Sequence, residues 1–208
     1  STIIASGKGV VLTDTKGKKY IDGMAGLWCV NIGWGHQEVV QAITEQAENL
    51  AYYHSFFSMG TEAPIRLADR IMSFVPDNMS KIFFGNSGSD ANDTNIKLVW
   101  YYNNIRGKPE KQKIISRQRA YHGVSVASAS LTGLPSLHAA FNLPLPMILH
   151  TETPHYWRNA EPGMSEREYS KWCAQKLEEM ILAEGPETVG AFIAEPVMGA
   201  GGVIIPPA

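Results

Sequence analysis

The sequence has few cysteines, no long apolar run and no marked excess of charge of one sign. Cys29 and Cys173 are its two cysteines, and they form neither a disulfide framework nor a metal-ligand pattern. No apolar stretch is long enough to span a bilayer, and a formal net charge of −2 argues against a nucleic-acid surface. We therefore expect a soluble, cytoplasmic protein with neither a membrane nor a nucleic acid as its partner.

The two ends of the chain lack the composition of a tail. Residues 1–6 are too short and uncharged for a signal peptide, and the chain stops at Pro206-Pro207-Ala208. With 208 residues and 44% hydrophobic residues, the chain can build one large core or one domain and part of another. We expect a sequence that is cut at both ends.

The first part of the chain predicts a hairpin followed by two helices. Short apolar runs at residues 10–14 and 19–22 flank a glycine-containing turn, which is typical of a β-hairpin. Residues 36–51 have apolar residues at helical spacing. A second helix is expected to begin near Thr61, with Pro64 in its first turn, and to end at Pro76.

The second part predicts a parallel sheet with covering helices. Residues 81–84 and 113–116 read as strands on either side of a helix over residues 90–105. A capping box of Ser165 and Glu168 predicts a helix over residues 165–183, and a buried strand follows at residues 189–194. Residues 123–133 fit helix and strand equally well, and residues 142–164 are expected to form a long surface excursion.

The turn at residues 85–92 is the strongest candidate for a binding site. Small residues bring the backbone close to a ligand, and the turn opens a helix whose first N–H groups favour an anion. The hydroxyls of Ser87 and Ser89 add donors on either side of Gly88. A phosphate suits this turn, although an ordinary helix cap explains the same residues about as well. Neither a P-loop nor a dinucleotide fingerprint is present.

Two further segments follow predicted strands, at the edge of an α/β sheet where ligands bind. Tyr121, His122 and Gly123 follow the strand at residues 113–116, and the Tyr121 ring could stack on a flat heterocycle or simply pack on the core. Glu195 precedes a glycine-rich loop at residues 199–202. Its carboxylate could face a site or lie solvated in a loop.

Aromatic residues gather in two loops, at Leu27-Trp28 and at residues 52–57, which contain Phe56 and Phe57. They could form the walls of an apolar pocket, or pack in the core or a subunit interface. The six histidines have no metal-ligand spacing, so no metal is expected.

Taken together, these motifs resemble the class III pyridoxal-phosphate-dependent aminotransferases over essentially the whole chain. The resemblance rests on residues 17–23 (GKKYIDG), 33–36 (GWGH), 85–93 (GNSGSDAND), 121–123 (YHG) and 195–202 (EPVMGAGG). Within the family the chain is most similar to the ω-amino-acid:pyruvate transaminases, from residues 151–156 (TETPHY) and 178–188 (EEMILAEGPET).

The resemblance implies a role for each matching residue. Ser87, Gly88 and Ser89 would bind the phosphate of pyridoxal 5'-phosphate, with Tyr121 stacking on its ring and His122 and Gly123 beside it. Leu27, Trp28, Phe56, Phe57 and Glu195 would line the substrate pocket. The family's Schiff-base lysine, its aspartate partner to the pyridine nitrogen and its carboxylate-reading arginine are expected beyond Ala208, so no catalytic residue is assigned here.

The resemblance also implies a fold and an assembly. We expect the type I aminotransferase fold, an α/β protein with an incomplete three-layer α/β/α large domain. Residues 1–52 would form the N-terminal segment of the small domain and the crossing segment, and residues 53–208 the first part of the large cofactor-binding domain. A homodimer with its sites at the interface is expected.

The implied activity is transfer of an amino group from an amine or ω-amino acid to pyruvate or a similar keto acid. Two alternatives remain. The parent protein could be another class III enzyme, such as an aminomutase, a decarboxylase, or an ornithine or γ-aminobutyrate transaminase. The chain could instead be a truncated, non-catalytic binding fragment.

Overall fold

A computed structural model describes residues 1–208 and divides them into two compact units, unit 1 (residues 1–82) and unit 2 (residues 83–208). The elements of unit 1 are β1 (Ile4–Lys8), β2 (Val11–Asp14), β3 (Lys19–Ile21), α1 (Ala25–Trp28), α2 (Gln37–Leu50) and α3 (Glu62–Met72). The elements of unit 2 are α4 (Gly88–Ile105), β4 (Lys113–Arg117), α5 (Val126–Leu131), η1 (Pro135–Leu137), β5 (Ile148–Thr151), α6 (Tyr156–Asn159), α7 (Glu166–Glu184) and β6 (Val189–Phe192).

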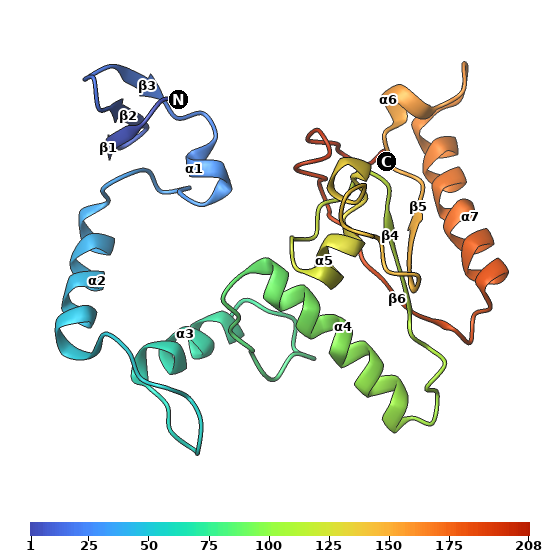
Figure 1. Cartoon of the computed structure of the whole chain (residues 1–208), viewed down its shortest axis with the longest axis horizontal. Helices are drawn as coiled ribbons and strands as arrows, with labels where there is room; N and C mark the ends of the chain where they lie inside the picture. The colour runs from blue at the N-terminus through green and yellow to red at the C-terminus, as the bar shows by residue number, and fades with distance from the viewer. The chain divides into compact units, whose positions relative to one another are not determined.

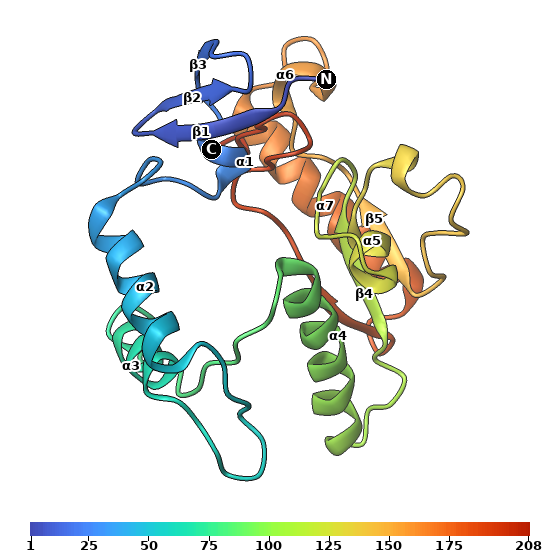
Figure 2. The same ribbon diagram turned by 60° about the vertical axis from the view of Figure 1, so that its left-hand side comes forward.

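Unit 1 begins with an antiparallel sheet in the order β1-β2-β3, which Figure 2 shows with its arrows alternating in direction. The predicted hairpin is confirmed as β2 and β3, and β1 pairs with the other edge of β2. Asp14 fixes the turn, since its carboxylate accepts the backbone N–H groups of Lys16 and Lys18 at 2.9 Å each and the hydroxyl of Tyr20 at 3.0 Å. One carboxylate thus sets the register of β2 and β3.

The two predicted helices of unit 1 are present. α2 spans Gln37–Leu50, within the expected residues 36–51. α3 begins at Glu62 with Thr61 as its N-cap, as expected, but it ends at Met72, before the proline at residue 76. A single 3₁₀-like turn closes α3, because the N–H of Ser73 bonds to the carbonyl of Arg70.

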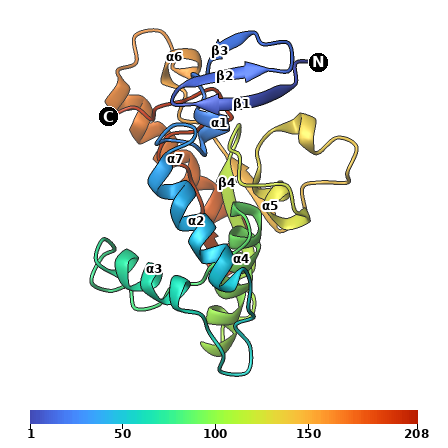
Figure 3. The same ribbon diagram turned by 90° about the vertical axis from the view of Figure 1, so that its left-hand side faces the viewer.

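Unit 2 is a three-layer α/β/α structure, as predicted. Its sheet has the order β5-β4-β6, and both pairings are parallel, with Ile114 opposite Ile148 on one side and Ala191 on the other. α4 and α5 lie side by side on one face of this sheet, and α7 covers the other face (Figures 1 and 3). The carboxyl ends of the parallel strands therefore meet at one edge, where the loops after β4 and β6 begin.

The core of unit 2 explains why these layers hold together. Ile114 of β4 packs with Ile96 of α4, Leu131 of α5 and Ile148 of β5, all at most 4% exposed. The next residue along β4, Ile115, points to the opposite face and is fully buried. On that face Tyr169 of α7 is 1% exposed, and its hydroxyl donates to the carbonyl of Thr153 at 2.9 Å.

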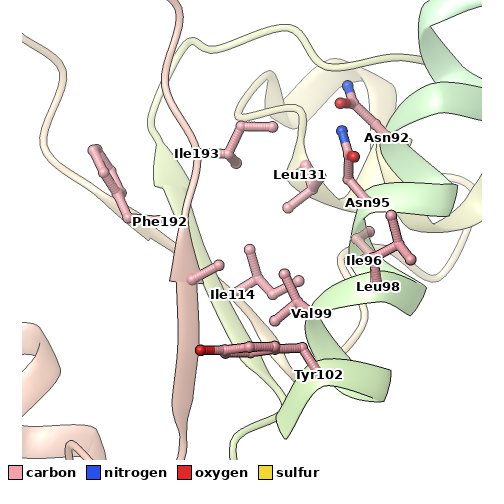
Figure 4. Close-up of a pocket in the computed structure, with 11 residues that line it drawn as sticks. Asn92, Asn95, Ile96, Leu98, Val99, Tyr102, Ile114, Leu131, Phe192 and Ile193 are labelled. Atoms are coloured by element: carbon pink, nitrogen blue, oxygen red, sulfur yellow. The ribbon is translucent and has the colours of Figure 1, made fainter. Parts of the chain in front are cut away.

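An apolar groove of about 430 Å³ remains between α4 and the edge strand β6. Figure 4 shows Val99 and Tyr102 of α4 facing Ile114 and Ile193 across it, whereas the ring of Phe192 points away from α4. The groove is continuous with the core of unit 2, because Ile96 and Ile114 belong to both the groove lining and the core. No helix combines the length and apolar character needed to cross a bilayer.

Two expectations need correction. Residues 81–84 form no strand, because no neighbouring strand supplies a hydrogen-bonding partner for them. Residues 142–164 are not simply a surface excursion, since they contain β5 and α6. Residues 123–133, which the pattern left undecided, include the helix α5. The domain boundary expected at residue 52 stays a prediction.

Candidate functional site

The N-terminus of α4 presents unpaired donors in an arrangement that suits an anion. Ser87 is the N-cap, and its Oγ accepts the backbone N–H of Asp90 at 3.1 Å. The first helical bond runs from the N–H of Ala91 to the carbonyl of Ser87 at 3.0 Å. The N–H groups of Gly88 and Ser89 therefore precede the helical ladder and point out of it, and the dipole of this 18-residue helix favours negative charge there.

The two serine hydroxyls beside these N–H groups can act as donors. The Oγ of Ser89 accepts the N–H of Val124 at 3.0 Å, and the Oγ of Ser87 accepts that of Asp90. Because each oxygen already accepts a backbone proton, each hydroxyl keeps its own proton to donate. Ser87, Gly88 and Ser89, called the cradle below, thus offer up to four donors. The residues present fit a phosphate group.

The tyrosine segment, residues 121–124, is bound directly to α4. Besides the bond from Val124 to Ser89, the side-chain amide of Asn92 donates to the carbonyl of His122 at 2.7 Å. Gly123 lies so close to α4 that an added Cβ would come within 2.5 Å of the Ser89 Oγ. Its φ of 133° is also one that residues with a side chain rarely adopt. Glycine at this position lets the segment lie against the cradle.

Two other side chains hold the tyrosine segment from elsewhere in unit 2. The hydroxyl of Thr132, which follows α5, accepts the N–H of His122 at 2.9 Å and donates to the carbonyl of Gly123 at 3.2 Å. The carboxylate of Glu195, which follows β6, accepts the N–H of Tyr121 at 2.9 Å. Tyr121 is 40% exposed, so part of the residue is accessible to a ligand.

The glycine-rich loop after β6, residues 199–202, is fixed to the same segment. The second oxygen of Glu195 accepts the N–H of Gly199 at 2.9 Å. The guanidinium of Arg119 donates twice to the carbonyl of Gly201, at 3.1 and 2.6 Å. Beneath these bonds, Ala120 and Met198 are fully buried. The loop and the tyrosine segment therefore form one hydrogen-bonded layer.

Unit 2 thus brings together seven of the residues singled out in the sequence: Ser87, Gly88, Ser89, Tyr121, His122, Gly123 and Glu195. Of these, His122 is 7% exposed, so it packs beneath the layer and its backbone makes the contacts described above. Asn92, Thr132 and Arg119 are not among the site residues predicted from the sequence. Asn92 is part of the quoted 85–93 motif and could have been found there, but no local signal marks Thr132 or Arg119.

Leu27, Trp28, Phe56 and Phe57 lie in unit 1, and all four are exposed, from 60% for Trp28 to 91% for Phe57. Leu27, Trp28 and Phe57 have positive φ values of 64°, 73° and 55°. Left-handed backbone is costly for residues with side chains, and such positions concentrate at functional sites. The left-handed turn at α1 presents the indole of Trp28 to solvent.

Two histidines behind the tyrosine segment are held in their neutral form. The Nε2 atoms of His122 and His150 are both buried and have no hydrogen-bonding partner. Burial is the largest cause of the lowered pKa of each imidazole. The charge of Glu195 raises the pKa of His122, whereas those of His150 and Arg117 lower it further. The charge of His138 lowers the pKa of His150.

These lowered pKa values predict acid sensitivity. Between the lowered pKa and the ordinary value of about 6.5, the unfolded chain binds protons that the folded chain does not. The free energy of unfolding should therefore fall as the pH is lowered through this window and level off above pH 7. Urea unfolding at a series of pH values measures the slope. Replacing His150 with glutamine should reduce that slope by about half, since one of two titrating groups is removed. An unchanged slope in His150→Gln contradicts the assignment.

The sequence is similar to known aminotransferases over nearly its whole length. The aminotransferase class-III family model matches residues 1–208. A diaminobutyrate–2-oxoglutarate transaminase from Halomonas elongata is 53% identical over 99% of this chain and 44% of its own length. A γ-aminobutyrate transaminase 3, chloroplastic, from Solanum lycopersicum is 53% identical over 99% of this chain and 40% of its own length. The chain spans less than half of the length of these relatives.

Solved structures give the same result. The omega transaminase from Pseudomonas jessenii in complex with PMP superposes with a TM-score of 0.97 and 51% identity, covering 100% of this chain and 46% of that one. A thermostable omega transaminase variant engineered for asymmetric synthesis of enantiopure bulky amines matches equally well, with a TM-score of 0.97 and 51% identity. It covers 100% of this chain and 46% of that one. Each of these similarities covers residues of both unit 1 and unit 2.

Proposed function

We propose, from the premise that this chain belongs to the class III aminotransferases, that the whole protein carrying residues 1–208 is a pyridoxal-phosphate-dependent transaminase. It would move an amino group from an amine or ω-amino acid to pyruvate or a similar keto acid. The observation that carries the proposal is the cradle at the N-terminus of α4, hydrogen-bonded through Ser89 to Val124 of the tyrosine segment, in which Tyr121 is exposed. A phosphate group and a flat ring match these two features in one ligand.

The residues of unit 2 would divide the binding of pyridoxal 5'-phosphate between them. The N–H groups of Gly88 and Ser89 and the hydroxyls of Ser87 and Ser89 would bind the phosphate. The ring of Tyr121 would stack on the pyridine ring, with His122 and Gly123 shaping the backbone beside it. When bound, the cofactor supplies an electron sink for the transfer chemistry. This chain's residues contribute binding and orientation.

Leu27, Trp28, Phe56 and Phe57 would line the substrate pocket. The engineered omega transaminase described above carries, among its substitutions, changes at a tryptophan and a phenylalanine 28 positions apart. Trp28 and Phe56 have the same types and the same separation in this chain. The exposed, left-handed turn that presents Trp28 agrees with a side chain held for contact with a ligand.

Replacing Trp28 with glycine is therefore expected to admit larger amines. Loss of the indole removes a wall of the pocket, and the kcat/KM for a bulky arylalkylamine relative to β-alanine should rise about tenfold or more, or about 1.4 kcal/mol in differential binding. Steady-state kinetics with both donors measures this ratio. Trp157→Gly is the matched control, since Trp157 is 88% exposed in α6 and has no proposed role. An unchanged ratio in Trp28→Gly removes this residue from the pocket.

The proposed activity is tested on the whole protein loaded with pyridoxal 5'-phosphate. β-Alanine, γ-aminobutyrate, diaminobutyrate and 1-phenylethylamine serve as donors, each with pyruvate and with 2-oxoglutarate. Transfer to pyruvate from an ω-amino acid or amine supports the proposal. A strict need for 2-oxoglutarate would favour the activity named for the Halomonas relative. Cofactor binding without any transfer would support a non-catalytic binding protein.

We further propose that the protein is a cytoplasmic homodimer whose partner subunit covers the exposed aromatic residues of unit 1. Phe57 and Phe56 are 91% and 72% exposed in the single chain, which is unusual for large apolar side chains close together. Both cysteines are free thiols, which agrees with a reducing compartment. Light scattering after size-exclusion chromatography should give twice the mass of the whole protein, and a monomer would contradict the dimer.

A further inference from the structure

The carboxylate of Glu195 joins two backbone segments that are far apart in the sequence. Its Oε1 accepts the N–H of Tyr121, and its Oε2 accepts the N–H of Gly199, each at 2.9 Å. The first bond spans 74 positions of sequence. Both oxygens are thus committed to backbone donors. A carboxylate in the substrate pocket would instead direct an oxygen toward the ligand.

The surroundings of Glu195 make this connection rigid. Arg117 donates from its Nη1 to the backbone carbonyl of Glu195 at 3.2 Å, which holds the residue itself. On the far side of the layer, Arg119 holds Gly201 with two bonds. An alanine at position 201 would place its Cβ against the carbonyl of Arg119, so glycine at this position lets the loop lie close enough to residue 119 for these two bonds. Glu195 has few ways to reorient without breaking both of its bonds.

The bond between Glu195 and Tyr121 matters because the other three residues of the tyrosine segment are held by other side chains. His122, Gly123 and Val124 are bound through Asn92, Thr132 and Ser89, but Tyr121 is bound only through Glu195. Its ring is otherwise partly exposed. The direction in which the ring leaves the backbone therefore depends on the Glu195 carboxylate.

We infer that Glu195 is a positioning residue and not a substrate contact. By accepting the N–H of Tyr121, its carboxylate fixes the position from which the Tyr121 ring can stack on a ligand. The inference rests on the proposed function for the role of the Tyr121 ring, but the anchoring itself does not depend on a cofactor. Glutamine at position 195 is the informative change. Glutamine keeps the shape of the side chain and one acceptor oxygen. Its amide NH₂ would face one of the two backbone N–H groups, so one of the two hydrogen bonds is lost.

Amide hydrogen exchange of the protein without cofactor tests the anchoring directly. In Glu195→Gln, peptides covering residues 119–124 and 196–203 should exchange about tenfold faster or more, since a charge-assisted bond is lost. The α7 peptides should not change. Glu178→Gln is the matched control, because Glu178 lies exposed on α7 and its variant should exchange like the wild type. Unchanged exchange at both 119–124 and 196–203 overturns the anchoring.

A double-mutant cycle on cofactor affinity tests whether Glu195 acts through Tyr121. Glu195→Gln should raise the Kd for pyridoxal 5'-phosphate about tenfold. In the Tyr121→Ala background, the same change should raise it by no more than about twofold, because the ring to be positioned is gone. Equal effects in both backgrounds mean that Glu195 acts independently of Tyr121 and overturn the inference.

Kinetics with saturating cofactor separates positioning from substrate contact. A substrate contact would raise the KM of charged donors in Glu195→Gln while the cofactor Kd stayed unchanged, and this result would also overturn the inference. If the wild-type protein binds no cofactor, the proposed function fails. Amide hydrogen exchange of Glu195→Gln still tests, in that case, whether Glu195 holds the two backbone segments. Should Glu195→Gln not fold, Glu195→Asp replaces it in each experiment, since the shorter side chain keeps the charge but cannot reach both N–H groups.

Discussion

Replacing Gly133 with alanine is expected to lower the free energy of unfolding by about 3 kcal/mol or more. An alanine Cβ would collide with the carbonyl of Arg117 and would come within 2.8 Å of the backbone nitrogen of Arg119. These are backbone atoms, which cannot rotate away as a flexible side chain can. Overpacking against backbone is among the most destabilising single changes.

The local hydrogen bonds prevent Gly133 from shifting to make room. Its N–H donates to the carbonyl of Ala120 at 2.8 Å, and its carbonyl accepts the N–H of Arg119 at 2.7 Å. Any movement that relieves the collision must break one of these buried bonds. Because the preceding residue is Thr132, the damage should also reach His122 and Gly123.

Urea unfolding followed by circular dichroism measures the effect. Gly23→Ala is the control, since an added Cβ at Gly23 meets nothing within 4 Å and its φ is not left-handed. The control should unfold within about 0.5 kcal/mol of the wild type. A loss of less than about 1 kcal/mol in Gly133→Ala would show that the packing around residues 117–120 is looser than the structure indicates.

Features that depend on residues close together in the sequence could be predicted, whereas features that depend on contacts between distant residues could not. The helix α7 was predicted with its capping box, because Ser165 and Glu168 are three residues apart and the structure has both bonds of the box. The Asp14 turn is likewise local. By contrast, β5 was missed, since it has four residues, follows two prolines and contains a histidine and a threonine. A strand this short is recognised mainly through its pairing with β4.

The same distinction applies to the site. The cradle was found because its signal is contiguous, from Gly85 to Asn92. The anchors of the tyrosine segment come from Asn92, Thr132 and Glu195, and they join residues up to 74 positions apart. Nothing in the sequence near Tyr121 indicates that its N–H needs a carboxylate. The family resemblance implies that Glu195 lines the substrate pocket, whereas its bonding partners depend on tertiary structure.

Gly88→Ala is expected to separate cofactor binding from folding. An added Cβ at Gly88 meets nothing within 4 Å, and φ at this position is not left-handed, so the fold tolerates it. Alanine in the first turn of α4 should leave the free energy of unfolding unchanged or raise it by about 0.5 kcal/mol. A side chain on a helix tilts toward the N-terminus, so this methyl group would project into the cradle.

The phosphate must approach the N–H groups of Gly88 and Ser89 to about 3 Å to form hydrogen bonds. A methyl group in that space would push it away from donors that have no other partner, and each charge-assisted bond lost weakens binding by about 1.5–3 kcal/mol. The Kd of the whole protein for pyridoxal 5'-phosphate should therefore rise about tenfold to a hundredfold. Fluorescence titration measures this Kd, and urea unfolding of the same variant checks its stability. Unchanged affinity in a stable Gly88→Ala protein would mean that the phosphate binds elsewhere than at the N-terminus of α4.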